Sequence, residues 1–500
     1  MTVTCLARRA RHRLPPLRVR RGGRTSPRSV ALGLVLALLA VATPASAQDG
    51  VQTLHYKYGP ITISPGQNTI ELEANTLKPP VDGWITGFRP NLVRKDGTVP
   101  RVDVIHLHHG VWLKNYQPLF AAGEEKTTFK APPGYGWRYR TTDTWHMNHM
   151  IHNLTPTPEK VYITYDLDFV PDGSPAAAGM NEVDTVWLDT VGGAYPVFDA
   201  KRGTGGKDRQ FTYPDEAPAA PRRNTWTVPE DGAIVGTAGH LHPGGLWTDL
   251  TLTRDGRSIR LFRSKAVYYE PAGAVSWDVS MTTTPPTWRV GLRKGDVLSV
   301  SGTYDTKRAS WYESMAIMPT MFDPGGTGAD PFVTNVDVEG AVTHGHLPEN
   351  DSHGGGRFAG LPDPRGLLAR PVPSGGGTVA IRDFVYGQGD LSSTGRRGRP
   401  ARVRRGRGLT FVNRDAKATI YHTITACRAP CNRTTGIAYP LADGKVDFDS
   451  GELGFGPEGF TPAANRDRWT TPKGLKAGTY TYFCRVHPFM RGAFKVKRGR

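Results

Sequence analysis

The sequence predicts an all-β protein of three domains. Its 500 residues include 59 glycines and 41 prolines, a composition that favours turns and short strands over long helices. Segments such as 161–169 and 296–304 alternate apolar with polar residues and are rich in β-branched and aromatic side chains, which is typical of strands. Polar stretches rich in glycine and proline separate the three parts. The predicted limits are 48–205, 206–346 and 376–500, with a linker at 347–375.

Residues 1–47 have the features of an export signal. An Arg-rich segment precedes an apolar run at 30–41, and Ala45-Ser46-Ala47 offers a small-residue cleavage site. The apolar run is about 12 residues long, which is too short to span a bilayer comfortably. We therefore expect an exported protein, extracellular, periplasmic or at the cell surface, whose mature chain has no membrane span.

The formal net charge of +18 comes largely from this leader and from an Arg-rich segment at 396–407. Such a segment can bind nucleic acid or an acidic partner, but a solvated loop is the simpler interpretation. Because an exported protein meets little nucleic acid, we expect no nucleic-acid partner.

Cysteine is sparse, and one cysteine needs a chemical explanation. Cys5 belongs to the leader, and Cys427 and Cys431 are close enough in sequence to form a small disulfide. Cys484 then stands alone, which is unusual in an exported protein.

Cys484 lies in the pattern Cys-x2-His-x2-Met with His487 and Met490. A blue-copper site needs one thiolate, two imidazoles and a weak axial thioether. His422 follows an apolar strand about 60 residues upstream and is the candidate for the second imidazole. The sequence therefore predicts a copper centre of His422, Cys484, His487 and Met490. A free reactive thiol at Cys484 is the competing role.

These residues resemble the plastocyanin and pseudoazurin group of cupredoxins, over about residues 376–498. The resemblance implies a Greek-key β-sandwich whose type 1 copper carries one electron. The long stretch between His422 and Cys484 departs from the most compact members.

Histidines also cluster upstream of this domain. On a strand, His240 and His242 would share one face because they are two residues apart. The adjacent His108 and His109 need a strand end or a bulge to converge. Neutral imidazoles suit copper or zinc, and a thioether favours copper. The clusters are His106, His108 and His109; His240 and His242; His146, His149 and His152; and the methionines Met315 and Met318.

In order and content these clusters resemble the copper monooxygenases that include peptidylglycine alpha-hydroxylating and dopamine beta-monooxygenase. The resemblance implies two successive β-sandwiches with one copper each. The first copper would be held by His108, His109 and His152, with His149 as the substitute for His152. The second, catalytic copper would be held by His240, His242 and Met315.

Three features depart from that family. The region has no cysteine, Ala238 stands where the peptide-amidating enzyme has an arginine, and Pro319 stands where it has a tyrosine. A peptidylglycine substrate is therefore not expected. The segments 106–113 and 238–245 also look like the stress-up-regulated nodulin family, which shares the layout without an established reaction.

The sequence thus favours an exported copper protein. Its blue centre would take electrons from a donor protein or small reductant and feed an upstream two-copper region acting on dioxygen and an organic substrate. The alternatives are a non-enzymatic electron carrier or copper-binding protein, and a zinc or structural metal upstream.

Overall fold

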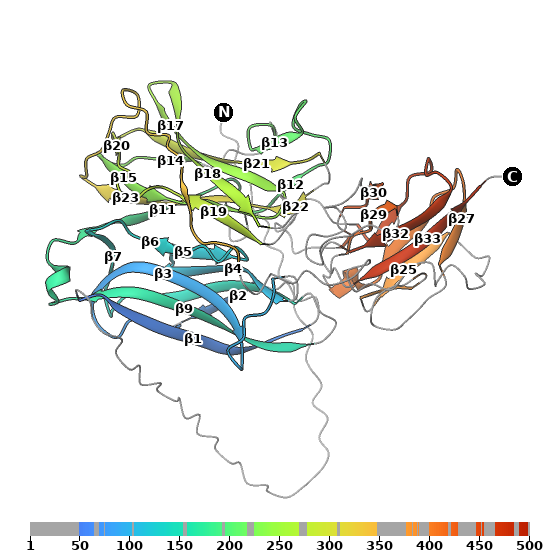
Figure 1. Ribbon diagram of the computed structural model, residues 1–500, viewed down its shortest axis with the longest axis horizontal. Coiled ribbons are helices and arrows are strands. Elements are labelled where there is room, and N and C mark those ends of the chain that lie inside the picture. The colour runs from blue at the N-terminus through green and yellow to red at the C-terminus, as the bar shows by residue number, and fades with distance from the viewer. Residues whose placement is uncertain are drawn as a thin grey trace, which may run out of the picture. The chain divides into compact units, whose positions relative to one another are not determined.

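The computed structural model describes residues 50–64, 70–74, 76–102, 105–153, 158–192, 196–217, 225–269, 278–307, 311–347, 377–382, 384–387, 389, 400–418, 422–428, 447–451, 453–454, 466–484 and 490–498. Nearly all regular structure is β, as the sequence predicts (Figure 1). Helical structure in the described part comprises the short 3-10 turns η1 (Pro175–Ala177) and η3 (Asp415–Ala418). No helix among these residues is long and apolar enough to cross a membrane. The predicted leader at 1–47 lies outside the described residues, as does the linker except for residue 347.

The first sandwich has two sheets, drawn in blue and green in Figure 1. One contains, in spatial order, β1 (Gln52–Ile63), β9 (Glu159–Pro171), β3 (Gly83–Arg94), β7 (Tyr135–Tyr139) and β10 (Asn181–Glu182), with β6 (Phe129–Lys130) beside β3. The other contains β2 (Ile70–Ala74), β8 (Trp145–Asn153), β4 (Ile105–Lys114) and β5 (Gln117–Gly123).

The second sandwich begins with β11 (Asp184–Asp189). The preceding strand, β10, pairs within the first sandwich, so the change between the two lies near residue 183, upstream of the expected limit at 205. One sheet contains β11 (Asp184–Asp189), β23 (Ala316–Pro324), β15 (Gly232–Thr237) and β20 (Val290–Leu292), with β16 (His240–Leu241) beside β23. The other contains β13 (Gln210–Tyr213), β21 (Val297–Asp305), β17 (Gly245–Arg254), β18 (Arg257–Tyr268), β19 (Val279–Thr283) and β24 (Ala341–Val342), with β14 (Thr225–Thr227) beside β21. A further pair joins β12 (Phe198–Ala200) to β22 (Trp311–Ser314).

The strands β4 and β8 are buried on both faces, unlike the half-exposed strand β9. One face packs into the interior of the first sandwich through Leu107, Trp112 and Ile151. The same apolar cluster continues into the second sandwich through Val235 and Met321. Because both faces are covered, these strands do not show the simple apolar–polar alternation of a solvated sheet.

A bulge in β4 changes which side chains face the second sandwich. Leu107 pairs with Ile151, but the next pair is His109 with Met150, so His108 is an extra residue. Leu107 and Trp112 consequently both face the interior although they are an odd number of residues apart. A bulge of this kind re-aims neighbouring side chains, and it turns His108 and His109 to the same side, as their convergence requires.

The C-terminal domain is a third two-sheet body, orange and red in Figure 1. Its core includes Cys484 and Met490 beside Tyr482 and Phe411. The parallel pairs β25–β28 and β27–β33 join strands distant in sequence. One sheet contains β26 (Val385–Tyr386), β25 (Thr378–Arg382), β28 (Thr410–Asn413) and β31 (Arg468–Thr470), and the other β27 (Ala401–Arg404), β33 (Arg491–Lys497), β32 (Gly478–Phe483), β29 (Thr425–Arg428) and β30 (Phe448–Asp449).

Candidate metal centres and the pocket between the first two sandwiches

The C-terminal candidate centre joins two segments that are 62 residues apart. His422 Nδ1 lies 3.8 Å from Cys484 Sγ, and both side chains are fully buried. Two ligands bound at about 2.1 and 2.3 Å to one metal, at an angle of 110–120°, would be roughly 3.6–3.8 Å apart. The nitrogen and sulfur are therefore spaced as ligands of one ion.

The remaining two predicted ligands have different outcomes. Met490 is fully buried in the same core as Cys484, and its carbonyl oxygen accepts a hydrogen bond from the Cys484 amide at 3.1 Å. His487 lies outside the described residues. The predicted disulfide between Cys427 and Cys431 stays a prediction, because Cys431 also lies outside the described residues. Cys484 itself is a thiol rather than half of a disulfide.

Neighbouring groups hold His422 and Cys484 in place. The His422 Nε2–H donates to Asp415 Oδ2 at 2.9 Å, which leaves Nδ1 to face the sulfur. The Thr423 backbone N–H donates to Cys484 Sγ at 3.3 Å, which fixes the position of the sulfur. Burial opposes protonation of His422, but the contacts with Asp415 and Cys484 outweigh it and raise its pKa.

Histidines of the first and second sandwiches meet at the interface between them. The ring of His108 lies 4.1 Å from that of His152 and 4.5 Å from that of His242, measured between centroids. His106 lies 5.0 Å from His152. The structure therefore brings the predicted ligands His108 and His152 together and adds His242, which the sequence assigned to the other set.

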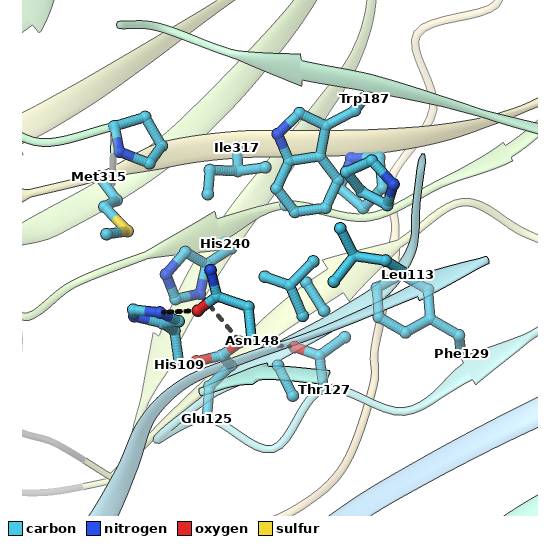
Figure 2. A pocket seen from close by; sticks show the side chains of 17 residues that line it. His109, Leu113, Glu125, Thr127, Phe129, Asn148, Trp187, His240, Met315 and Ile317 are labelled. Carbon is cyan, nitrogen blue, oxygen red and sulfur yellow. Dashed lines mark hydrogen bonds and ion pairs between the residues drawn. The ribbon is translucent and has the colours of Figure 1, made fainter. Parts of the chain in front are cut away.

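His109, His240 and Met315 instead line a pocket beside this cluster (Figure 2). The His108 and His109 rings are 6.0 Å apart, and the His240 and His242 rings are 5.2 Å apart. Each predicted ligand set is therefore divided. His108, His152 and His242 lie in the cluster, and His109, His240 and Met315 line the pocket.

Two polar side chains orient the pocket imidazoles. His240 Nδ1 lies 2.9 Å from Glu125 Oε1, and His109 Nε2 lies 3.1 Å from Asn148 Oδ1. Both oxygens accept, so these nitrogens donate, and the opposite ring nitrogens carry the lone pairs. Fixing a ligand imidazole through its second nitrogen is typical of metal sites. Glu125 belongs to the first sandwich and His240 to the second, so the contact also joins the two bodies.

Tyr304 anchors the backbone around the second predicted set. Its hydroxyl donates to the Met315 carbonyl oxygen at 2.5 Å and accepts from the amides of Met315 and His242 at 3.1 and 3.2 Å. His242 Nδ1 bonds to the carbonyl of Glu313, which leaves Nε2 buried without a hydrogen-bond partner among the described residues. That nitrogen has the lone pair that a metal would use.

Burial disfavours the charged form of four of these imidazoles. Desolvation lowers the pKa of His106 and of His109 to about 4 in each case. It lowers the pKa of His108 and His242 well below the usual value, and the neighbouring histidines add to the shift. A neutral imidazole is the form that binds a metal.

The other histidines of β8 point elsewhere. His149 Nε2 lies 3.6 Å from Glu73, and its ring faces Tyr58 on β1, which places it toward the interior of the first sandwich. His146 stacks on Tyr116 at 4.1 Å. Met318 is buried in the apolar core of the second sandwich. Of the two candidates for the third ligand, His152 and not His149 lies beside His108.

As they stand, no three His, Cys, Asp or Glu side chains of the described part could hold one metal ion. In the C-terminal domain, His487 is outside that part and Met490 is not of these types. Upstream, two imidazoles on one tetrahedral ion would have centroids about 5 Å apart. The His106–His152 and His240–His242 pairs match this spacing, whereas His108 is packed more tightly. Donor type and burial suit copper, but the spacing around His108 is too tight for ligands of one ion.

Sequence reasoning missed Glu125, Asn148 and Tyr304. Glu125 is fully buried although it follows another glutamate in a turn, where a solvated pair is the usual expectation. Asn148 lies between His146 and His149 in sequence, and the alternation of β8 could have placed it on the face of His152. No local signal marks Tyr304, because its hydroxyl bonds to residues 11 and 62 positions away in the chain.

No family model matches the chain, and no curated protein matches it. Among solved structures, the chain is similar to the copper-containing nitrite reductase of Thermus scotoductus, with 14% identity over 53% of this chain and 55% of that one and a TM-score of 0.15. A structure of Sulfolobus Turreted Icosahedral Virus has 8% identity over 56% and 96% of the two chains and a TM-score of 0.11. The tandem CBM51 modules of a family 98 glycoside hydrolase from Streptococcus pneumoniae have 9% identity over 53% and 83%, with a TM-score of 0.13. Likenesses this weak carry no argument about function.

Proposed function

We propose that this chain is an exported electron-transfer protein with a type 1 copper centre held by His422, Cys484, His487 and Met490. The observation that carries the proposal is the 3.8 Å separation between His422 Nδ1 and Cys484 Sγ in a fully buried setting. A structural thiol without a metal would not need an imidazole nitrogen aimed at its sulfur. The thiolate and imidazole types are those of a blue-copper site.

Copper bound there would alternate between its cupric and cuprous states and so carry one electron. The protein holds two of the ligands in place through neighbouring groups. Asp415 fixes the ring of His422, and the Thr423 amide fixes the sulfur of Cys484. Burial of His422, Cys484 and Met490 excludes water, which would keep the reorganisation small when the charge changes.

The test is the colour and paramagnetism of the full chain loaded with cupric ion. We expect the intense blue absorption of a copper–thiolate bond and a narrow copper hyperfine splitting. Cys484→Ser should abolish both, whereas Cys427→Ser, which changes another cysteine of the same domain, should retain both. A colourless loaded protein, or a blue Cys484→Ser variant, would contradict the proposal.

A second candidate function concerns the upstream region. The six predicted ligands lie around one interface, and three of them, His109, His240 and Met315, open on a pocket. This arrangement supports an oxygen-dependent hydroxylation, for which bound copper would supply the redox chemistry. One oxygen atom enters a C–H bond and the other leaves as water, with two protons and two electrons. The electrons would come from a donor protein or small reductant through the C-terminal centre.

Two measurements separate this candidate from its rivals. Copper analysis of the full chain should give three equivalents if both upstream sites bind and one if the blue centre is alone. Oxygen consumption by the reduced, copper-loaded protein should depend on an organic substrate. Copper binding without such consumption would favour a carrier or copper-binding protein, and zinc in place of upstream copper would end the hydroxylation hypothesis.

A further inference from the structure

The pocket between the first two sandwiches has candidate metal ligands on one side and apolar side chains on the other. Its volume is about 180 Å³. In Figure 2, His109, His240 and Met315 lie on one side, and Trp187, Leu113 and Phe129 lie on the other. The donor atoms thus face one end of a bound molecule and the apolar side chains face the other.

In the metal-free protein, the described lining of the pocket has no group that would balance an anion. No lysine or arginine is among the described residues that line it. Its one carboxylate, Glu125, directs Oε1 toward the Gly123 amide, the Thr127 hydroxyl and His240 Nδ1. An anionic ligand would lose its hydration without gaining a cation, which is costly in an apolar site. In the metal-free protein an ammonium group would lose its hydration as well, and Glu125, the one carboxylate that could pair with it, already faces His240 Nδ1 at 2.9 Å.

The volume limits the size of the occupant. An engineered apolar cavity of about 150 Å³ takes up one benzene molecule. A pocket of about 180 Å³ therefore has room for one substituted six-membered ring or a short hydrocarbon chain. A peptide or a sugar chain would not fit inside it.

We propose that this pocket binds a small, uncharged and mainly apolar molecule, such as a monosubstituted benzene. Its ring packs against Trp187 and Phe129, and its substituent is directed toward His240 and Met315. Its role as the substrate rests on the upstream hydroxylation candidate, but the binding itself does not require copper or catalysis.

The test is binding of toluene, benzoate and benzylamine to the full chain, measured by calorimetry with the metal-free and the copper-loaded protein. These probes share a ring and differ in charge. We expect toluene to bind both forms at one equivalent, and benzoate and benzylamine to bind the metal-free form at least about 100-fold more weakly, because each would have to bury a charge there without a metal to bind it. Benzoate or benzylamine binding the metal-free form as tightly as toluene would overturn the proposal.

Two variants locate the binding. Ala121→Phe puts a ring into the pocket that Ala121 lines and should abolish toluene binding, with Ala121→Leu intermediate. Val333→Phe adds a ring at a site that is 84% exposed and should leave binding unchanged. Thermal unfolding checks that each variant is folded, and Ala121→Leu serves if the larger change prevents folding. Toluene binding unaffected by either change at Ala121 would refute this location.

The outcomes also separate this proposal from the proposed function. If toluene binds but the copper-loaded protein consumes no oxygen with any neutral ring compound, the binding proposal is supported and the hydroxylation candidate is refuted. If toluene does not bind while the protein is blue, the pocket proposal fails and the electron-transfer centre stands.

Discussion

The ring of His108 lies 4.5 Å from the ring of His242, edge to face at 74°, although the two residues belong to different sandwiches. His108 is the extra residue of the bulge in β4, and His242 follows β16 directly. The contact exists because the second sandwich covers the outer face of β4. The two histidine sets are therefore parts of one interface rather than separate sites on separate domains.

His242→Ala should lower the copper content of the full chain from three equivalents to two or fewer, because it removes a buried nitrogen that has no other hydrogen-bond partner in the described part. The blue absorption should be unchanged. His55→Ala is the matched control, since His55 has a side chain that is 64% exposed and pairs with Asp166 on the first sandwich. Metal analysis after dialysis measures the copper content, and equal copper in the two variants would contradict a role of His242 in binding.

Glu125→Gln should weaken upstream copper binding by about 10–100-fold, the usual effect of losing a group that orients a ligand imidazole. The carboxylate holds His240 and makes its ring a better donor. Competition with a chelator of known affinity measures the change. Glu339→Gln, at an exposed carboxylate paired with Lys265, should have the affinity of the unmodified protein; a loss of the same size there would show that the effect is not local.

Tyr304→Phe should destabilise the second sandwich by roughly 1–3 kcal/mol, because it leaves buried backbone groups of His242 and Met315 without their partner. The phenol makes three hydrogen bonds to those two residues. Denaturant unfolding of the metal-free protein measures the stability. Tyr116→Phe is a control at a tyrosine that is 63% exposed and should shift the midpoint little; a similar shift in both would argue against the anchoring role.

Asp415→Asn should raise the reduction potential of the blue centre. A carboxylate near the metal favours the cupric state, and Asp415 reaches the ring of His422 at 2.9 Å. One charge at about 6 Å in an effective dielectric of about 20 is worth roughly 3 kcal/mol, or on the order of 100 mV. Redox titration of the blue absorption measures the shift. Asp467→Asn, at a second aspartate of the same domain, should have a smaller effect, and a lowered potential in Asp415→Asn would contradict the account.

The metal-free protein should lose stability as the pH falls below about 6.5. His106 and His109 have a pKa of about 4 in the folded state, below the ordinary value of 6.5, because burial disfavours the charged ring. Between these two values the unfolded chain binds protons that the folded chain does not, so the free energy of unfolding decreases as the pH falls. The slope is about 1.4 kcal/mol per pH unit for each histidine.

Denaturant unfolding between pH 7.5 and 4.5 checks this sign. His106→Asn removes one of the groups and should flatten the slope, whereas His55→Asn, at an exposed position, should retain it. A stability that rises on acidification, or an unchanged slope in His106→Asn, would be inconsistent with neutral buried rings.

The sequence by itself determined the β class and the donor types, because strand alternation, turn residues and the Cys-x2-His-x2-Met spacing are local properties. The tertiary structure decided which imidazoles are neighbours. A one-residue bulge turned both His108 and His109 outward, and docking of the second sandwich brought His242 to His108. It also buried Glu125 and Tyr304 against His240 and His242, which are far away in the chain. Such contacts depend on how sheets pack against each other, which spacing along a single chain does not encode.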